Sequence, residues 1–187
     1  MITIIFEAHG TSYDNEEKRA SGWGGVGLSE LGKKQSKELG ERYKDEHLDT
    51  VFCSDLRRAV ETAEMAFSGR DIPIIQDVRL RECDYGDWTG RSSEEVEIEK
   101  ASRISKPFPG GESYEDTAKR MKSFLEDLLK DYDGKKVVII GHRATQYGLE
   151  NWIKGVPLKE AVTTTWQWQP GWTYRLISLS AVDNSIP

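Results

Sequence analysis

The sequence near the N-terminus runs Ile4-Ile5-Phe6-Glu7-Ala8-His9-Gly10-Thr11. Its apolar half predicts a buried strand, and the polar His-Gly pair marks the point where the chain leaves the sheet. In open α/β sheets, ligands bind beyond the carboxyl ends of the strands, so a histidine at this position faces a crevice. The stretch therefore predicts an active-site loop that begins at His9.

A second histidine follows the other strongly apolar run of the chain. His142 comes directly after Val137–Gly141, and the chain has three histidines in all. A lone histidine is more often a hydrogen-bonded structural residue than a functional one. Two histidines at matched strand ends reverse that expectation, and they predict one shared site.

Length and composition indicate a soluble globular protein. At 187 residues and 21.2 kDa, we expect one domain that spans residues 1–187. No apolar run approaches the roughly 18 residues that a membrane helix needs, so we expect no membrane association. The opening apolar segment is too short for a signal-peptide core and lacks a basic flank, which predicts a cytoplasmic protein.

Charge and cysteine content narrow the possible partners. A net charge of −6 and a pI near 5.2 argue against general nucleic-acid binding, although an acidic protein can hold a local cationic pocket for a phosphate. Cys53 and Cys83 have no metal-type spacing, so we expect reduced thiols that pack in the interior. The sequence fits either a monomer or a homodimer.

Strand and helix patterns alternate along the chain, which predicts a parallel-rich sheet covered on both faces. Capping residues and apolar periodicity give the expected boundaries. After the first strand we expect a functional loop over 12–28, a helix over 29–46, a strand over 50–53, a helix opened by Ser54-Asp55, and a strand over 72–75. Beyond an irregular segment at 80–90, we expect a helix from 112 to 133, a strand over 135–141, a helix over 144–153, and two edge strands around Pro170-Gly171. Residues 91–107 fit either a helix or a mobile flap.

Several motifs occur together in one order along the chain. They are His9-Gly10 with Asn15, residues 54–59 with Thr62-Ala63, Leu80-Arg81-Glu82 with Gly86 and Gly90, residues 109–113, and Gly141-His142. Together they resemble the histidine phosphatase superfamily, the phosphoglycerate mutase-like proteins. The resemblance implies a three-layer α/β/α sandwich with a mostly parallel sheet, and phosphoryl transfer through a phosphohistidine without a metal or another cofactor.

Each of these residues has a chemical reason to belong to such a site. An imidazole nitrogen is nucleophilic near neutral pH, so His9 is the candidate nucleophile. Phosphoryl transfer needs positioning and charge stabilisation, for which Arg58, Asn15, Gly10 and His142 are candidates. The resemblance implies that Glu82 is the general acid that protonates the leaving alkoxide.

Plainer roles are open for several of these residues. Arg57 fits an ordinary solvated helix face, Asn15 fits a residue that stabilises a turn, and Glu82 fits an ion pair with Arg79 or Arg81. The tryptophans of the C-terminal segment, Trp166, Trp168 and Trp172, are more often packing residues than substrate-binding ones, so we assign them no catalytic role.

The chain departs from the family pattern at one position. The family has an arginine directly before its nucleophilic histidine, whereas this chain has Ala8. Arg143 follows His142, where the family usually has glycine, and it is the candidate that replaces the missing charge. The plainer alternative is that Arg143 forms a surface ion pair, for example with Glu7.

The sequence leaves three functions open. The favoured one is a metal-independent phosphomonoesterase that acts on a small phosphorylated metabolite; a mutase is its close variant. The second is a binding or regulatory protein that kept the fold and lost turnover with the arginine. The third, a metal-dependent hydrolase, is least favoured because no ligand spacing such as H-x-x-x-H is present.

Overall fold

The computed structural model describes residues 1–180, which contain one five-stranded sheet in the order β3-β2-β4-β1-β5. The strands are β1 (Ile2–Ala8), β2 (Thr50–Cys53), β3 (Ile74–Gln76), β4 (Lys136–Gly141) and β5 (Trp172–Leu176). All neighbouring strands are parallel except β5, which runs antiparallel to β1. The expected mostly parallel sheet is confirmed. The single domain expected over residues 1–187 stays a prediction, because residues 181–187 lie outside the described residues.

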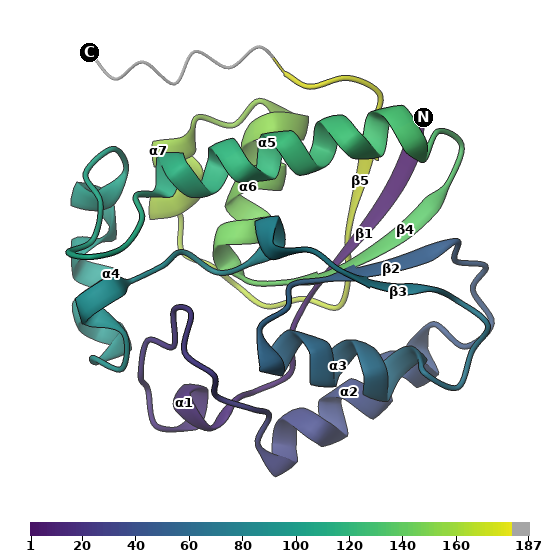
Figure 1. Ribbon diagram of the computed structural model, residues 1–187, viewed down its shortest axis with the longest axis horizontal. Coiled ribbons are helices and arrows are strands. Elements are labelled where there is room, and N and C mark those ends of the chain that lie inside the picture. The colour runs from purple at the N-terminus through teal and green to yellow at the C-terminus, as the bar shows by residue number, and fades with distance from the viewer. Residues whose placement is uncertain (181–187) are drawn as a thin grey trace.

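Helices cover both faces of the sheet (Figure 1). One face carries α2 (Glu30–Arg42) and α3 (Arg57–Phe67), and the other carries α5 (Tyr114–Asp131) and α6 (Arg143–Lys154), with α7 (Leu158–Thr163) beside α6. Among the described residues, no helix is long and apolar enough to cross a membrane.

The central strands are apolar on both sides because both sides are buried. Ile4 and Phe6 of β1 pack in a cluster with Phe124 of α5. Ile5, which points to the opposite face, packs in a second cluster with Phe67 of α3. Two separate cores therefore hold β1 and β4 rigidly in the middle of the sandwich.

The strand register brings the two histidines together. Ala8 of β1 is paired with Gly141 of β4, and the next residues are His9 and His142. The amide of His9 continues the ladder by donating to the carbonyl of Gly141 over 3.1 Å. The first loop also lies close to α2, since a Cβ on Gly10 would stand 2.6 Å from the carbonyl oxygen of Gly32. The matched strand ends expected from the sequence are thus neighbours in the sheet.

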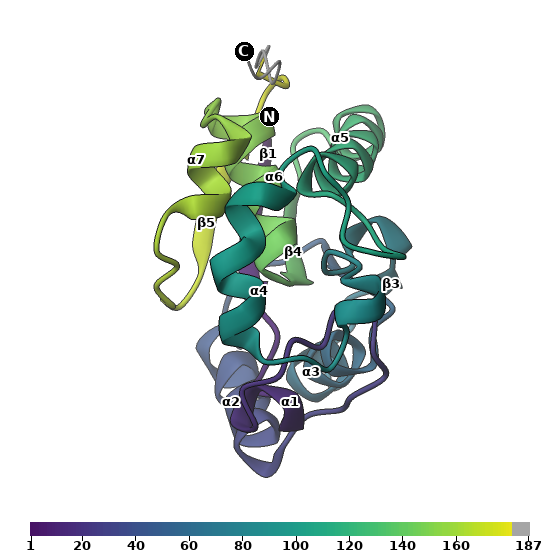
Figure 2. The same ribbon diagram turned by 90° about the vertical axis from the view of Figure 1, so that its left-hand side faces the viewer.

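Two excursions surround these strand ends. The first follows β1 and contains α1 (Tyr13–Glu16), and the second contains α4 (Ser93–Glu99) and the 3-10 turn η3 (Lys100–Arg103). The intervening segment has two further 3-10 turns, η1 (Val78–Leu80) and η2 (Gly86–Trp88). In Figure 2, α4 stands in front of the sheet edge where the strands end. The segment 91–107 is therefore helical in its first part.

Two expectations about local structure were wrong. The helix after β2 begins at Arg57 with Leu56 as its N-cap, so Ser54 is not the cap. The Ser54 hydroxyl accepts from the Leu56 amide over 3.4 Å and lies 2.6 Å from Nε2 of His142. Of the two edge strands expected around Pro170-Gly171, only β5 exists in the described residues. The residues just before Gly171 form no strand. Trp166 and Trp168 of this segment instead line the cavity at the carboxyl ends of the strands.

Candidate active site

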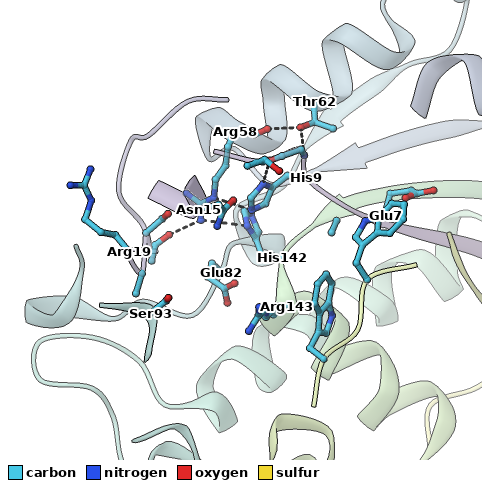
Figure 3. Close-up of a pocket in the computed structure, with 18 of the residues that line it drawn as sticks. Glu7, His9, Asn15, Arg19, Arg58, Thr62, Glu82, Ser93, His142 and Arg143 are labelled. Atoms are coloured by element: carbon cyan, nitrogen blue, oxygen red, sulfur yellow. Dashed lines mark hydrogen bonds between the residues drawn. The ribbon is translucent and has the colours of Figure 1, made fainter. Parts of the chain in front are cut away.

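A cavity of about 660 Å³ opens at the carboxyl ends of β1 and β4. All seven site residues expected from the sequence line it; all but Gly10 are labelled in Figure 3. They are His9, Gly10, Asn15, Arg58, Glu82, His142 and Arg143. Residues of the loop 12–28 and of α4 complete the walls, so both excursions from the sheet contribute to one pocket.

His9 is held as a neutral imidazole whose Nε2 carries no proton. The Gly10 carbonyl oxygen lies 2.7 Å from its Nδ1, and since a carbonyl only accepts, Nδ1 carries the proton. The backbone amide of Gly10 in turn donates to the Thr62 hydroxyl over 3.0 Å, which fixes this turn of the chain. Burial, and secondarily the charge of Arg58, lower the pKa of His9 to about 3, against the opposing effect of the bond to Gly10. The lone pair of Nε2, which accepts a long hydrogen bond from Nε of Arg58 over 3.3 Å, is therefore unprotonated and can attack an electrophile.

His142 is fixed beside it in the opposite tautomer. The centres of the two imidazole rings are 5.0 Å apart, and the His142 side chain is buried. Its Nδ1 lies 3.4 Å from Nη2 of Arg58, which can only donate, so the proton resides on Nε2 and is shared with the Ser54 hydroxyl at 2.6 Å. Burial, followed by the charges of Arg58 and His9, lowers the pKa of His142 well below its usual range.

Arg58 is a buried cation between the two histidines. Its side chain is 1% exposed, its Nη2 donates to the Gly22 carbonyl over 2.8 Å, and its Nη1 donates to the Gly24 carbonyl over 3.2 Å. Its Nε lies 3.3 Å from Nε2 of His9. Within residues 1–180, no carboxylate lies within ion-pair distance of this guanidinium, and burial lowers its pKa. An uncompensated buried charge is costly, so the site favours an anion that enters beside His9.

Glu82 comes from another part of the chain and lies beside the junction between β4 and α6. Its Oε1 accepts hydrogen bonds from the amides of Cys83, over 2.8 Å, and Ala144, over 3.2 Å, which leaves Oε2 to face the pocket. The suggestion that Glu82 pairs with a neighbouring arginine was wrong, because both arginines bind other carboxylates. These ion pairs are Arg79 with Asp77 and Asp127, and Arg81 with Asp55.

Asn15 has both a structural contact and a free group. Its Oδ1 accepts from the amide of Ser12 over 2.9 Å in a capping box that starts α1. The turn-stabilising role is therefore real, and it uses only the oxygen of the amide. Because Asn15 also lines the cavity, its Nδ2 group can serve as a neutral donor to an anion there.

Arg143 lines the same cavity but is held at its outer wall. Its Nη1 lies 3.4 Å from Oε2 of Glu97 on α4, and its guanidinium stacks 5.0 Å from the ring centre of Trp166. The plainer alternative, a surface ion pair of Arg143, is confirmed. Its suggested partner Glu7 was wrong, because Glu7 is buried against Arg42 and Tyr43. Neither histidine nor Arg58 forms a hydrogen bond with Arg143 in the described residues.

The sequence reasoning missed several residues that shape the pocket. Ser54 orients His142, and the carbonyls of Gly22 and Gly24 hold Arg58. The signal for Ser54 was its position directly after β2, at the same sheet edge as the histidines. Lys100 also lines the pocket, and nothing in its local sequence distinguishes it from a solvated lysine.

The two cysteines and Arg57 have structural roles or lie at the surface. Cys53 and Cys83 are buried and unbridged, as expected for packing residues. Arg57 is exposed and paired with Glu61, as expected for a solvated helix face. Among residues 1–180, no group of three or more His, Cys, Asp and Glu side chains is arranged to hold a metal ion.

The fold and the pocket together indicate the class of ligand that the site binds. The protein has an α/β sandwich whose pocket, at the strand ends, sets a neutral imidazole against an unpaired guanidinium, an arrangement that suits a small anion. The sequence matches the histidine phosphatase superfamily (branch 1) over residues 4–170. The chain belongs to this family, as the resemblance had indicated.

The names of relatives within the family indicate two kinds of activity, hydrolysis and mutase activity. The chain is 31% identical to phosphoserine phosphatase 1 of Hydrogenobacter thermophilus, over 86% of this chain and 80% of that protein. It is 34% identical to a 2,3-bisphosphoglycerate-dependent phosphoglycerate mutase of Chelativorans sp., over 86% and 85% of the two chains. The solved structure of YhfR of Bacillus stearothermophilus superposes with a TM-score of 0.85 at 26% identity, over 100% of this chain and 98% of that one. The chain's relatives are therefore hydrolases and mutases of phosphorylated compounds.

Proposed function

We propose that the protein is a metal-independent phosphomonoesterase that transfers the phosphoryl group of a small ester to His9 and then to water. The observation that carries this proposal is the buried Arg58, which has no carboxylate partner in residues 1–180 and lies between two neutral imidazoles. A dianionic phosphoryl group placed beside Nε2 of His9 supplies the missing counter-charge.

The first step breaks the ester P–O bond and forms a P–N bond to Nε2 of His9. Nδ1 keeps its proton throughout, because the Gly10 carbonyl holds it. Glu82, which faces the pocket through Oε2, donates a proton to the departing alkoxide. Arg58, the Nδ2 group of Asn15 and His142 hold the transferring oxygens, and an incoming phosphate dianion favours protonation of His142.

The second step reverses these roles with water as the acceptor. The Glu82 carboxylate removes a proton from a water molecule, whose oxygen attacks phosphorus while the P–N bond breaks. The products are orthophosphate and a regenerated neutral His9. Gly10 takes part through its carbonyl and its fixed position, since its own amide is already bonded to Thr62.

A chromogenic aryl phosphate tests the proposal directly. We expect turnover by the wild-type protein, unchanged by EDTA, and none by His9→Ala. Activity that disappears with EDTA and returns with a divalent ion would favour a metal-dependent hydrolase.

The absence of an arginine at position 8 supports a second candidate, a phosphate-binding protein without turnover. Removing one preorganised donor commonly costs about 10²–10³ in rate, so Ala8 without compensation leaves a slow enzyme. Calorimetry with orthophosphate that shows binding, together with no hydrolysis of any ester, would select this candidate. The mutase variant rests on the mutases among the relatives, and a transfer of label between two positions of one substrate would reveal it.

A further inference from the structure

The cavity that contains His9 has an extension bounded by α2, the end of β1 and the segment before β5. Figure 3 shows Glu7 on one side of His9, whereas Asn15 and Arg58 lie on the other side. Ala8, which precedes His9, is small and partly exposed. We call this extension the Ala8 lobe, and its walls are formed by Glu7, Ala8, Gln35, Arg42, Trp166 and Trp168. The lobe therefore begins directly beside the proposed nucleophile.

The Ala8 lobe has no unpaired cation among the described residues that line it. Nη2 of Arg42 donates to the buried carboxylate of Glu7 over 2.9 Å, and the Tyr43 hydroxyl donates to the same oxygen over 2.6 Å. Trp168 is 60% exposed and presents its indole on the cavity wall. A neutralised ion pair beside an aromatic face suits a neutral group with a ring, and does not suit a second anion.

The inner end of the pocket, at Arg58 and the two histidines, holds one fixed positive charge. Arg58 is 1% exposed and has no carboxylate within ion-pair distance in residues 1–180. His9 and His142 are neutral because burial lowers both pKa values. Arg143 supplies no second charge there, since an ion pair holds it at the outer wall.

This charge balance separates two classes of phosphate ester. The phosphoryl group of a diester carries one negative charge, which Arg58 alone neutralises. A monoester dianion brings a second negative charge, and its compensation requires a proton on a buried imidazole. The inner end is therefore better matched in charge to a diester than to a monoester.

The two ester groups of a diester can extend from phosphorus in different directions. Glu82, the proposed acid, lies below the two histidines in Figure 3, whereas Glu7 lies to their right. The ester group that departs faces Glu82, and the one that stays on phosphorus faces the Ala8 lobe. The cavity volume of about 660 Å³ lies within the range of roughly 300–1,000 Å³ that encloses drug-sized ligands, so both groups have room.

We propose that the protein is also a phosphodiesterase, which binds diesters whose retained ester group is neutral, contains a ring and lies in the Ala8 lobe. This inference goes beyond the proposed phosphomonoesterase activity, and it rests on the same nucleophile. In the first step, Nε2 of His9 forms a P–N bond, the bond from phosphorus to the departing oxygen breaks, and Glu82 gives its proton to that oxygen.

The second step releases a monoester. The Glu82 carboxylate takes a proton from water, the water oxygen bonds to phosphorus, and the P–N bond breaks. The net reaction converts one diester and one water into one monoester and one alcohol. His9 and Glu82 end in their starting protonation states.

Two aryl esters with the same leaving group provide the test. Phenyl 4-nitrophenyl phosphate is a diester, 4-nitrophenyl phosphate is the corresponding monoester, and both release 4-nitrophenolate. The wild-type protein is expected to have a kcat/KM about tenfold or more higher for the diester, because one missing donor costs the dianion about 10²–10³ in rate. Methyl 4-nitrophenyl phosphate should react about 5- to 100-fold more slowly than the phenyl diester, as for the loss of one stacked ring.

Changes at position 8 separate the volume of the lobe from its charge. Ala8→Leu fills the lobe without adding charge, so it should lower the ratio of diester to monoester kcat/KM about 10²-fold. Ala8→Arg also adds a cation that favours the dianion, so it should lower the ratio about 10²-fold further. The ratio is measured within one preparation, so a partly misfolded variant does not alter it.

Two matched controls change charge outside the pocket. Ala101→Arg on η3 adds a cation and Lys154→Met on α6 removes one, and both positions are exposed and do not line the cavity. Both variants should keep the wild-type ratio. A ratio that falls equally in Ala101→Arg and Ala8→Arg would mean that overall charge, rather than the lobe, sets the preference.

The trapped intermediate distinguishes the two activities chemically. Rapid quenching with a diester labelled in its phenyl ring should leave the label on the peptide that contains His9, because the phenyl group stays on phosphorus. In ¹⁸O-labelled water, the released phenyl phosphate should carry one ¹⁸O on phosphorus. A phosphoenzyme without the phenyl label would show that the diester does not react directly, and would reject the inference.

Binding provides a readout that does not need turnover. Calorimetry on His9→Ala should give a lower Kd for diphenyl phosphate than for phenyl phosphate, and an added Ala8→Leu change should remove the difference. A Kd for phenyl phosphate that is equal or lower would overturn the role of the Ala8 lobe. Hydrolysis of the monoester with none of the diester would overturn the inference and leave the proposed function standing, whereas cleavage of the diester alone would do the reverse.

Discussion

The inner end of the pocket and its outer wall are built by different means. At the inner end, Arg58 and His142 are 1% and 2% exposed, and backbone carbonyls, a serine hydroxyl and the ends of β1 and β4 hold the functional groups. At the outer wall, Arg143 and Glu97 are 49% and 48% exposed and are held by side-chain ion pairs on the excursions. We therefore expect changes at the inner end to affect the reaction of every ester, and changes at the outer wall to affect which ester binds.

The largest expected effect that separates the two regions is at Glu82. We expect Glu82→Gln to lower kcat/KM about 10²- to 10⁴-fold for alkyl phosphates and much less for activated aryl phosphates, because a general acid matters most for a poor leaving group. Steady-state kinetics on matched alkyl and aryl esters measure this. Equal losses on both ester types would remove Glu82 from the acid role.

Replacing an arginine by lysine in each region compares how strictly the two regions depend on the guanidinium geometry. Arg58→Lys should lower kcat/KM about 10²-fold on every ester, because an ammonium cannot bind two phosphate oxygens as the planar guanidinium does. Arg143→Lys should cost less than about tenfold, since a half-exposed ion pair tolerates a point charge. The two variants are compared on one alkyl ester, and comparable losses would mean that the outer wall is as geometrically demanding as the inner end.

The smallest expected effect is on stability in acid. His9 has a folded pKa of about 3 and an ordinary value of 6.5, so between these values the unfolded state binds more protons. Its contribution to the free energy of unfolding is complete above pH 6.5, and about 2 kcal/mol of it is lost between pH 7 and pH 5. His142 adds a loss in the same direction, because its pKa is also lowered by burial.

Denaturant unfolding at pH 7 and pH 5 measures this loss. His9→Asn should be less sensitive to acid than the wild-type protein. The matched control is His47→Asn, which changes an exposed histidine outside the pocket and should behave as the wild type does. If His9→Asn kept the full loss, the inner end would not hold His9 as a neutral imidazole.

The sequence predicted the inner end well for physical reasons. Strand ends are readable from apolar runs, and parallel register brings residues at those ends together, which is why His9, His142 and Arg58 were expected in one pocket. Ser54 was expected to cap the following helix, because a serine hydroxyl before a helix commonly does so. The sequence does not show that the register of β2 with β4 places this hydroxyl beside His142.

The outer wall was less predictable because its contacts depend on how long excursions fold back. The partner of Arg143 lies on α4, in a segment whose polar composition left its structure open, and Lys100 is buried only through that folding. The segment before Gly171 was expected as a strand from its alternating aromatics. It leaves the sheet instead, with Trp166 and Trp168 lining the pocket and Trp166 lying against Arg143.

The nucleophile itself is tested most directly by trapping. Rapid quenching after mixing with a phosphate-labelled ester should give a phosphoenzyme that is stable in alkali and labile in acid, with the label on the peptide that contains His9. The label should be absent from His9→Ala and present in Lys154→Met. A label carried by another residue, or retained in His9→Ala, would contradict the central role of His9.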